Sequence, residues 1–244
     1  MHAHIVHAHP EPGSYNAALT AAALEALQAH GGTTSITDLY QQGFDPVETA
    51  AHYGSRSDPD TFAALSEQRH AWQTGTLPQA IDDEIRNLET ADLLILQFPL
   101  WWHGPPAILK GWMDRVFVNG GLYTSRMRYD TGYFKGRRAL VSVTTGAPHE
   151  AFGPGSRGGD LDVILWPVQY SLHYMGFTIL PPYLSYGVQG HGYRYEEEHI
   201  VQDRLRKNLT AWAEHLSNLD QAEPLAFPSW ADWDESGRAV RLIS

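Results

Sequence analysis

The sequence contains no cysteine among its 244 residues. That absence excludes disulfide bonds, zinc–thiolate sites, iron–sulfur clusters and thiol nucleophiles together. Long hydrophobic runs are also missing. The densest apolar stretch, residues 91–102, is interrupted by Asp92, Gln97 and Pro99 and is shorter than the roughly 18 residues that a membrane span needs. The first residues contain neither Lys nor Arg and do not read as a secretory signal. We therefore expect a soluble, cytoplasmic protein.

Basic residues are few: 17 Lys and Arg stand against 28 Asp and Glu, a net charge of −11. A chain this acidic is a poor match for the phosphate backbone of nucleic acid. Histidines alternate at positions 2, 4, 7 and 9, but Ile5 and Val6 between them indicate a core strand, and no HExxH motif is present. No metal site is predicted.

Hydrophobic residues make up 43% of the chain, enough for the core of one large domain. Five β-rich runs alternate with helical patterns, and they cover residues 3–8, 33–39, 92–98, 138–144 and 178–186. The run at 92–98 is apolar almost throughout, which is typical of a central parallel strand buried on both faces. Residues 41–77 show no clear period and form a long excursion with a short helix near 62–72.

This alternation predicts an α/β fold, with a doubly wound five-stranded parallel sheet and a long excursion after the second strand. We expect a domain over residues 1–220 and a C-terminal tail, 221–244, packed on the same domain. In such a sheet, ligands bind outside the carboxyl ends of the strands. Three strand-exit loops are therefore candidates for the site.

The first loop, residues 9–16, contains Gly13 and a potential helix cap at Ser14. The first N–H groups of the helix that follows, those of residues 15–17, would favour a phosphate. An ordinary capped helix start is an equally good interpretation of this loop alone.

The second loop presents Trp101, Trp102 and His103 directly after a buried strand. Exposed indoles at a strand exit indicate a flat ligand, although Trp101 fits a cover for the core or a subunit interface equally well. The third loop begins Thr144-Thr145-Gly146-Ala147. Its residues 153–158 match G-x-G-x-x-G, but they lie far from the strand end and include a proline, which favours a flexible loop over a dinucleotide fingerprint.

Several motifs together are specific. They are Ala8-His9-Pro10, Ser14-Tyr15-Asn16, Gln97-Phe98-Pro99-Leu100, Pro106-Ala107-Ile108-Leu109-Lys110-Gly111-Trp112 and Val163-Ile164-Leu165-Trp166-Pro167. Together with Thr144-Thr145-Gly146, these motifs carry a resemblance to the NAD(P)H:quinone oxidoreductase family, and the resemblance covers most of the chain. The resemblance implies a flavodoxin-like homodimer that binds FAD, with FMN less suited, and that carries hydride from NAD(P)H to a quinone.

The resemblance also implies roles for individual residues. His9 and the turn of Ser14, Tyr15, Asn16 and Ala17 would hold the flavin phosphates. Pro99, Leu100, Trp101, Trp102 and His103 would lie along the isoalloxazine ring. Thr144, Thr145, Gly146 and Ala147 would bond its polar edge. Tyr123, Tyr129, Phe152 and Tyr174 would surround the substrate, some of them facing the flavin of the partner subunit.

The third loop departs from the family pattern. The family has a Tyr and a His after the Thr-Thr-Gly motif, and an ungapped match places Phe152 and Gly158 there. Arg157 and His149 lie nearby and are the candidate catalytic replacements, although both also fit solvated loop residues.

The main functional hypothesis is a flavin-dependent NAD(P)H oxidoreductase with a quinone-like acceptor. The loss of two catalytic groups leaves open an alternative, a flavin-binding regulatory or ancillary subunit of a potassium-efflux system. A third interpretation is a nicotinamide dehydrogenase without flavin.

Overall fold

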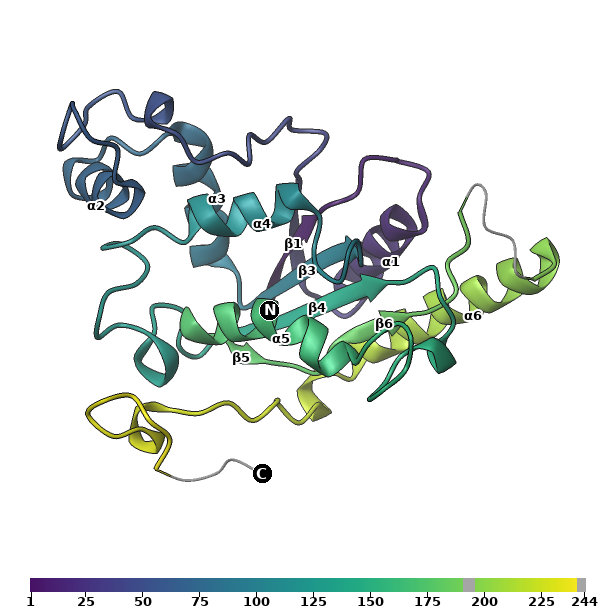
Figure 1. Ribbon diagram of the computed structural model, residues 1–244. Helices are drawn as coiled ribbons and strands as arrows, with labels where there is room; N and C mark the ends of the chain where they lie inside the picture. Colours follow the sequence, from purple (N-terminus) through teal and green to yellow (C-terminus); the bar gives the residue numbers. More distant parts are fainter. Residues whose placement is uncertain (191–195, 241–244) are drawn as a thin grey trace.

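The computed structural model describes residues 1–190 and 196–240. Its centre is a parallel sheet in which the strands lie in the order β2-β1-β3-β4-β5, with β6 also paired to β4 (Figure 1). The strands are β1 His2–His7, β2 Thr33–Asp38, β3 Leu93–Pro99, β4 Arg138–Thr144, β5 Thr178–Ile179 and β6 Tyr183–Ser185. Every pairing between strands in this sheet is parallel. The order reverses between β1 and β3, so ligands are expected at the carboxyl ends of these two strands.

The predicted fifth strand, residues 178–186, is two short strands in the structure. β5 pairs with the start of β4, and β6 pairs with its end. Pro181 and Pro182 stand between them, and neither has an N–H to donate to the ladder, so the strand is interrupted there.

Helices cover both faces of the sheet. α1 Tyr15–Ala29 and α6 Glu198–Ser217 pack together on one face, and their apolar residues join one core cluster. α3 Gln79–Thr90, α4 Ala107–Val116 and α5 Leu161–Tyr174 enclose the larger cluster on the other face (Figure 1). None of the helices in the described ranges is both long and apolar enough to cross a membrane.

The excursion after β2 packs closely on the α4 side of the molecule. It contains the short helix η1 Ala50–His52 and α2 Ala64–Thr74. A Cβ on Gly111 of α4 would lie 2.2 Å from the carbonyl oxygen of Pro46, so only glycine permits this approach. The fully buried Glu67 accepts the Ser57 N–H and hydroxyl, both at 2.9 Å, and the Ser57 N–H is the main reason its pKa is lowered. The excursion is therefore a fixed part of the fold.

A buried carboxylate also joins three elements on this face. Glu84 of α3 accepts the Thr37 hydroxyl of β2 at 2.7 Å and the Trp112 indole N–H of α4 at 2.8 Å. Burial nevertheless raises its pKa, because these two hydrogen bonds do not fully offset the loss of hydration.

The C-terminal tail lies against the β5 end of the sheet. The Leu225 N–H donates to the Ile179 carbonyl at 2.8 Å, and Phe227 packs on the larger core cluster. Short 3₁₀ turns, η4 Leu219–Gln221 and η5 Trp230–Asp232, break the path of the tail. Two other such turns, η2 Tyr129–Thr131 and η3 His149–Ala151, lie in the loops on either side of β4.

Candidate active site

The turn between β1 and α1 offers backbone N–H groups. The Ser14 hydroxyl caps the helix by accepting the Ala17 N–H at 3.1 Å, and the N–H groups of Tyr15 and Asn16 have no acceptor among the described residues. The Gly13 N–H is taken by the Glu11 carboxylate at 2.9 Å. Unpaired first-turn N–H groups with a helix dipole behind them favour an anion.

His9 lies beside this turn with a defined tautomer. Its Nδ1 accepts the Glu11 N–H at 3.0 Å. A neutral imidazole with an accepting Nδ1 carries its proton on Nε2. His9 can therefore donate Nε2–H to an anion bound at the turn.

The side chains of Tyr15 and Asn16 turn away from the ligand position. The Tyr15 hydroxyl bonds to Asn208 of α6 at 2.7 Å. Asn16 is buried, accepts from the Gln97 amide and donates to the Thr144 hydroxyl, both at 2.9 Å. These two residues can contact a cofactor only through their backbone, and the Asn16 side chain instead joins the start of α1 to the ends of β3 and β4.

The second loop is a tight hairpin turn. The N–H of Trp101 donates to the carbonyl of Gly104 at 3.0 Å, and the N–H of Gly104 donates back at 3.1 Å. The two central residues, Trp102 and His103, have φ of 50° and 58°. Positive φ at both positions is the geometry of a type I′ turn, which prefers Asn and Gly. Trp102 is 98% exposed, and Trp101 lies against the His9 ring at 5.9 Å between ring centres.

The third loop, residues 145–159, folds back on itself before α5. The Gly153 N–H donates to the Gly159 carbonyl and the Gly158 N–H to the Ala151 carbonyl. The G-x-G-x-x-G stretch at 153–158 is thus a closed loop that does not join a strand directly to a helix. The N–H groups of Gly146 and Ala147 have no acceptor among the described residues.

The second and third loops line a cavity of about 370 Å³ that is open to solvent. It is lined by Leu100, Trp102, His103, Thr145, Gly146, Ala147, Ala151, Phe152, Arg157 and Gly158. Most of the predicted ring-binding residues therefore come together. Thr144 lies beneath the cavity, where it accepts from Asn16. Arg157 reaches the cavity from the loop and is exposed, with no ion pair among the described residues.

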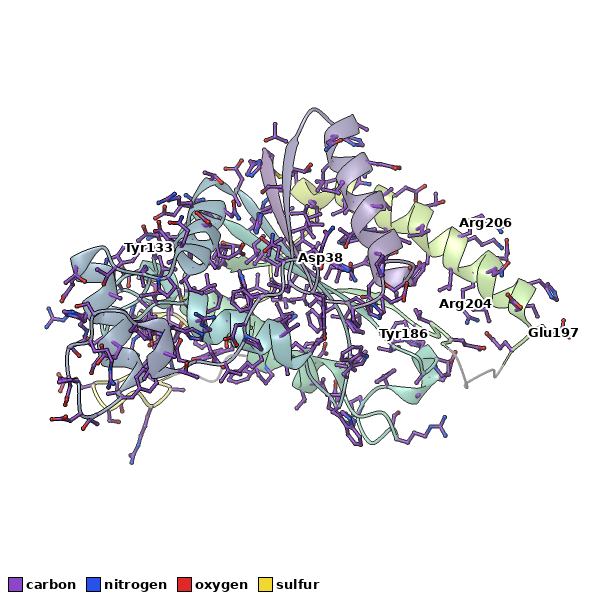
Figure 2. All side chains as sticks on the ribbon, turned by 90° about the horizontal axis from the view of Figure 1, so that it is seen from above. Asp38, Tyr133, Tyr186, Glu197, Arg204 and Arg206 are labelled. Atoms are coloured by element: carbon purple, nitrogen blue, oxygen red, sulfur yellow. The ribbon has the colours of Figure 1, made fainter. Side chains whose placement is uncertain are left out.

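His149 is not brought to this cavity. Its ring packs edge-on against Tyr186 at 5.0 Å, and Phe152 lies on the same tyrosine at 5.9 Å. Burial, and then the Asp162 carboxylate, raise the pKa of Tyr186, so its phenol is protonated at neutral pH. Nearby, Arg204 of α6 donates to the Gly187 carbonyl at 3.0 Å (Figure 2).

The conformation of the third loop leaves no room for a side chain at position 158. A Cβ on Gly158 would lie 2.7 Å from the Ala151 carbonyl oxygen and 2.9 Å from the Phe152 ring. A histidine cannot be placed there without moving the loop.

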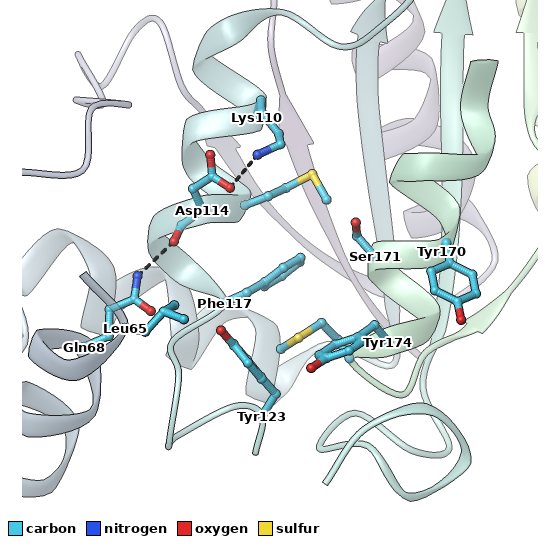
Figure 3. A pocket seen from close by; sticks show the side chains of 11 residues that line it. Leu65, Gln68, Lys110, Asp114, Phe117, Tyr123, Tyr170, Ser171 and Tyr174 are labelled. Atoms are coloured by element: carbon cyan, nitrogen blue, oxygen red, sulfur yellow. Dashed lines mark hydrogen bonds and ion pairs between the residues drawn. The ribbon is translucent and has the colours of Figure 1, made fainter. Parts of the chain in front are cut away.

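A second cavity, of about 290 Å³, lies between α4 and α5 (Figure 3). It contains two of the predicted substrate residues, Tyr123 and Tyr174, whose rings meet edge-on at 5.5 Å. Tyr129 lies just behind, 5.1 Å from the Tyr174 ring. No residue lines both cavities. The predicted substrate tyrosines thus lie close to one another, but apart from the residues predicted to bind the flavin ring in the same chain.

Sequence reasoning missed the residues that hold this tyrosine group. Arg128 donates to the Tyr174 hydroxyl at 3.0 Å and lies over the Trp230 ring of the tail. The Trp233 ring lies 4.7 Å from that of Tyr129. The two tail tryptophans, Trp230 and Trp233, stand out in the sequence, but they follow no period. A contact across about a hundred residues leaves no local signal.

Within residues 1–190 and 196–240, no three His, Asp or Glu side chains gather in a way that could hold a metal ion.

Comparison with known proteins identifies the family. The family model described as "Flavodoxin-like fold" matches residues 1–216. The chain is 39% identical to NAD(P)H dehydrogenase [quinone] 1 of Cavia porcellus over 241 residues, which is 98% of this chain and 84% of the relative. This chain belongs to the flavodoxin-like NAD(P)H:quinone oxidoreductase family.

Two further relatives agree with this assignment. Ribosyldihydronicotinamide dehydrogenase [quinone] of Mus musculus is 39% identical over 229 residues, covering 93% of this chain and 95% of the relative. The crystal structure of a putative quinone reductase from Klebsiella pneumoniae superposes with a TM-score of 0.88 at 32% identity, over 98% of this chain and 94% of that one. The predicted flavodoxin-like fold and the predicted family are confirmed.

Proposed function

We propose that this protein is a flavin-dependent NAD(P)H oxidoreductase that reduces a quinone or a similar flat acceptor. The observation that supports this most directly is the convergence of an anion-binding turn, an almost fully exposed indole and a pair of unpaired backbone donors at one edge of the sheet. The relatives described above are named as quinone dehydrogenases and reductases. None of these is named as a subunit of a potassium-efflux system, so that alternative has no support.

The residues present fit a flavin. The N–H groups of Tyr15 and Asn16, with His9 Nε2, would hold its phosphates. The Trp102 indole is exposed beside the cavity and would lie against the ring, since burying such a surface is favourable. The unpaired N–H groups of Gly146 and Ala147 would bond the polar edge of the ring. A bound flavin supplies the two-electron transfer between nicotinamide and acceptor, which no amino-acid side chain can carry out.

We infer that the flavin is FAD. The turn can hold phosphate groups, and the long excursion after β2 gives the chain its extra length relative to a minimal sheet-and-helix domain. Arg157 is the permanent cation of the cavity and stabilises negative charge that develops at the polar edge of the ring. The loss of a preorganised donor of this kind typically slows a reaction roughly a hundredfold.

A homodimer completes the proposed site. Trp102 is open to solvent in the single chain, and the half-buried tyrosines of the second cavity lie on another part of the same chain. A two-fold dimer brings the second cavity of one subunit over the Trp102 loop of the other, so that each acceptor lies between two chains. Sedimentation on dilution tests this, because loss of the dimer should accompany loss of quinone reduction, and a fully active monomer would contradict it.

We place this activity in the cytoplasm, and the 1–220 domain with its 221–244 tail should behave as one folding unit. Limited proteolysis that removed the tail and left the remaining protein with unchanged stability would contradict the second statement.

The absorption spectrum of the purified protein tests the central proposal. We expect a yellow protein that releases FAD on denaturation and is bleached by NAD(P)H under anaerobic conditions. Protein that stays colourless after incubation with FAD and with FMN would overturn the flavin assignment. A flavin-loaded protein that does not turn over quinones would overturn the enzymatic one.

The role of Arg157 has a separate test. Arg157→Ala should slow reduction of the protein by NAD(P)H in stopped-flow measurements. An unchanged rate would remove Arg157 from the proposed site and leave backbone N–H groups as the source of charge stabilisation.

A further inference from the structure

Reduction of a quinone needs protons as well as electrons. The balanced reaction is quinone + NAD(P)H + H⁺ → hydroquinone + NAD(P)⁺, so one proton must come from outside the nicotinamide. The inference below rests on the proposed function, and it concerns where that proton comes from.

The larger cavity contains few groups that can supply it. Its lining includes two ionisable side chains, His103 and Arg157. Arginine does not release a proton in proteins. The hydroxyl of Thr145 is already donated to the Ala147 carbonyl at 2.9 Å. Histidine is the side chain that loads and releases a proton near neutral pH. By chemistry alone, His103 is the lining residue suited to this step.

The position of the imidazole agrees with this role. His103 Cδ2 lies 3.8 Å from the point where a Cβ on Gly159 would stand, so the ring reaches across toward the third loop. Positions 158 and 159 are both glycine, so neither residue places a side chain of its own against the ring; the Ile164 side chain comes nearest on this side, with its Cδ1 3.0 Å from the same point. The imidazole has no hydrogen-bond partner among the described residues, and it is exposed, so both ring nitrogens remain available to an acceptor and to water.

The backbone supplies an independent observation. His103 has a φ of 58°, at a turn position where Asn or Gly is preferred. A non-glycine residue in this region is strained, and strained residues cluster at functional sites. Nothing in the local turn requires a histidine, because its two hydrogen bonds are both made by the backbone of Trp101 and Gly104.

We propose that His103 is the proton donor to the acceptor. The protonated imidazole gives its N–H proton to one oxygen of the quinone, forming the O–H bond, while the acceptor receives two electrons and the second hydrogen that originate from NAD(P)H. The neutral imidazole then takes a proton from solvent. Arg157, the other charged group that lines the cavity, holds negative charge but does not exchange protons.

Acceptors with different proton demands test this proposal. Ferricyanide takes single electrons and no proton, whereas a quinone needs the proton for each turnover. General acid catalysis typically contributes a factor of about 10²–10⁴. In stopped-flow oxidation of the NAD(P)H-reduced protein, His103→Gln and His103→Phe should slow the reaction with a quinone at least roughly tenfold more than the reaction with ferricyanide. Added imidazole should restore part of the quinone rate.

A second readout does not depend on turnover. In the absence of NAD(P)H the protein cannot turn over 4-nitrophenolate, and the phenolate oxygen of this probe resembles the oxyanion that His103 would protonate. Its dissociation constant, measured by absorbance, should rise severalfold in His103→Phe, which keeps a flat ring and lacks the N–H. His30→Gln, at the far end of α1, is the matched control and should change neither measurement.

The outcomes separate the two levels of the proposal. Equal loss with both acceptors would show a structural role for His103, and no loss with either would remove it from the reaction. If His149→Gln rather than His103→Gln slows only the quinone, the proton comes from the third loop and this proposal is wrong. If the wild type reduces ferricyanide but no quinone, it is the proposed function that fails.

Discussion

The Trp102–His103 turn allows a prediction in which stability and cofactor binding move in opposite directions. Replacing both residues by the pair that type I′ turns prefer, Trp102→Asn with His103→Gly, should stabilise the protein without flavin. The left-handed conformation costs a non-glycine residue about 1–2 kcal/mol, so two such residues store about 2–4 kcal/mol. The variant does not gain all of this free energy. Glycine costs about 0.5–1 kcal/mol because the unfolded chain has more conformational entropy, and asparagine in the left-handed conformation is still partly strained.

The expected net gain is therefore about 1–2 kcal/mol. Little packing is lost with the tryptophan, since its side chain is 98% exposed. For a domain of this size the gain corresponds to about 2–8 °C in melting temperature. The same variant should bind flavin more weakly, because the lost ring contact contributes about 1–3 kcal/mol, or roughly a 5- to 150-fold rise in dissociation constant.

Urea unfolding of the flavin-free protein and fluorescence titration with FAD measure the two effects. Trp102→Phe is the matched control: it keeps a strained side chain at the same φ, so the stability of the flavin-free protein should stay within about 0.5 kcal/mol of wild type. A double variant less stable than wild type would refute the reasoning. It would mean that the turn is held by side-chain contacts and is not strained.

Three further changes have expected outcomes. Burial raises the pKa of Glu84 above its ordinary 4.5. The stability that this carboxyl contributes is therefore present below that value and is lost as pH rises through the pKa of the folded state. In urea unfolding repeated from pH 4 to 8, Glu84→Gln should gain stability relative to wild type as pH rises, and a pH-independent difference would contradict this. Glu11→Gln removes a negative charge from the anion-binding turn and should tighten FAD binding roughly 2–5-fold, more at low salt than at high, in the same titration. Gly158→Ala should cost about 1–3 kcal/mol, because its Cβ would meet the Ala151 carbonyl at 2.7 Å, whereas Gly54→Ala has open space and should be nearly neutral by thermal unfolding.

The fold could be predicted from the sequence mainly because two neighbouring strands, β3 and β4, are largely apolar runs. β3 is buried at every position, and β4 at all but its first. The prediction failed at residues 178–186, where a β-rich composition outweighed the two prolines in its middle. Pro181 and Pro182 lie inside the predicted strand itself, so the sequence alone was enough to predict the interruption.

The site was predictable to the level of loops and only partly to the level of side chains. The strand-exit rule places ligands where β1, β3 and β4 end, and the cavity is lined by the loops that follow β3 and β4. The inward direction of Asn16 could not be predicted, because its partners Gln97 and Thr144 are 81 and 128 residues away. Gln97 did carry a signal, as a lone amide in an apolar strand, and buried amides need partners.

Backbone conformation was the other missing element. The residues of the Trp101–Gly104 turn do not predict positive φ at two large side chains, because the usual sequence signal for that geometry is Asn-Gly. Similarly, His149 and Arg157 were equivalent candidates in the sequence. The structure separates them, because the 3₁₀ turn η3 directs His149 to Tyr186 and leaves Arg157 on the cavity.

This separation bears on how the proposed site divides its chemistry. Gly158 cannot accept a side chain while the loop keeps its contact with the Ala151 carbonyl, so the third loop offers a fixed cation, Arg157, and no exchangeable proton at that position. The exchangeable proton is on His103, which belongs to the second loop. A permanent cation stabilises developing negative charge at every pH but cannot complete an O–H bond, whereas an imidazole completes the bond but stabilises charge only while it is protonated. Because the two groups belong to different loops, either can be altered without moving the other, and the loss of Arg157 should therefore affect electron entry from NAD(P)H while the loss of His103 affects proton delivery to the acceptor.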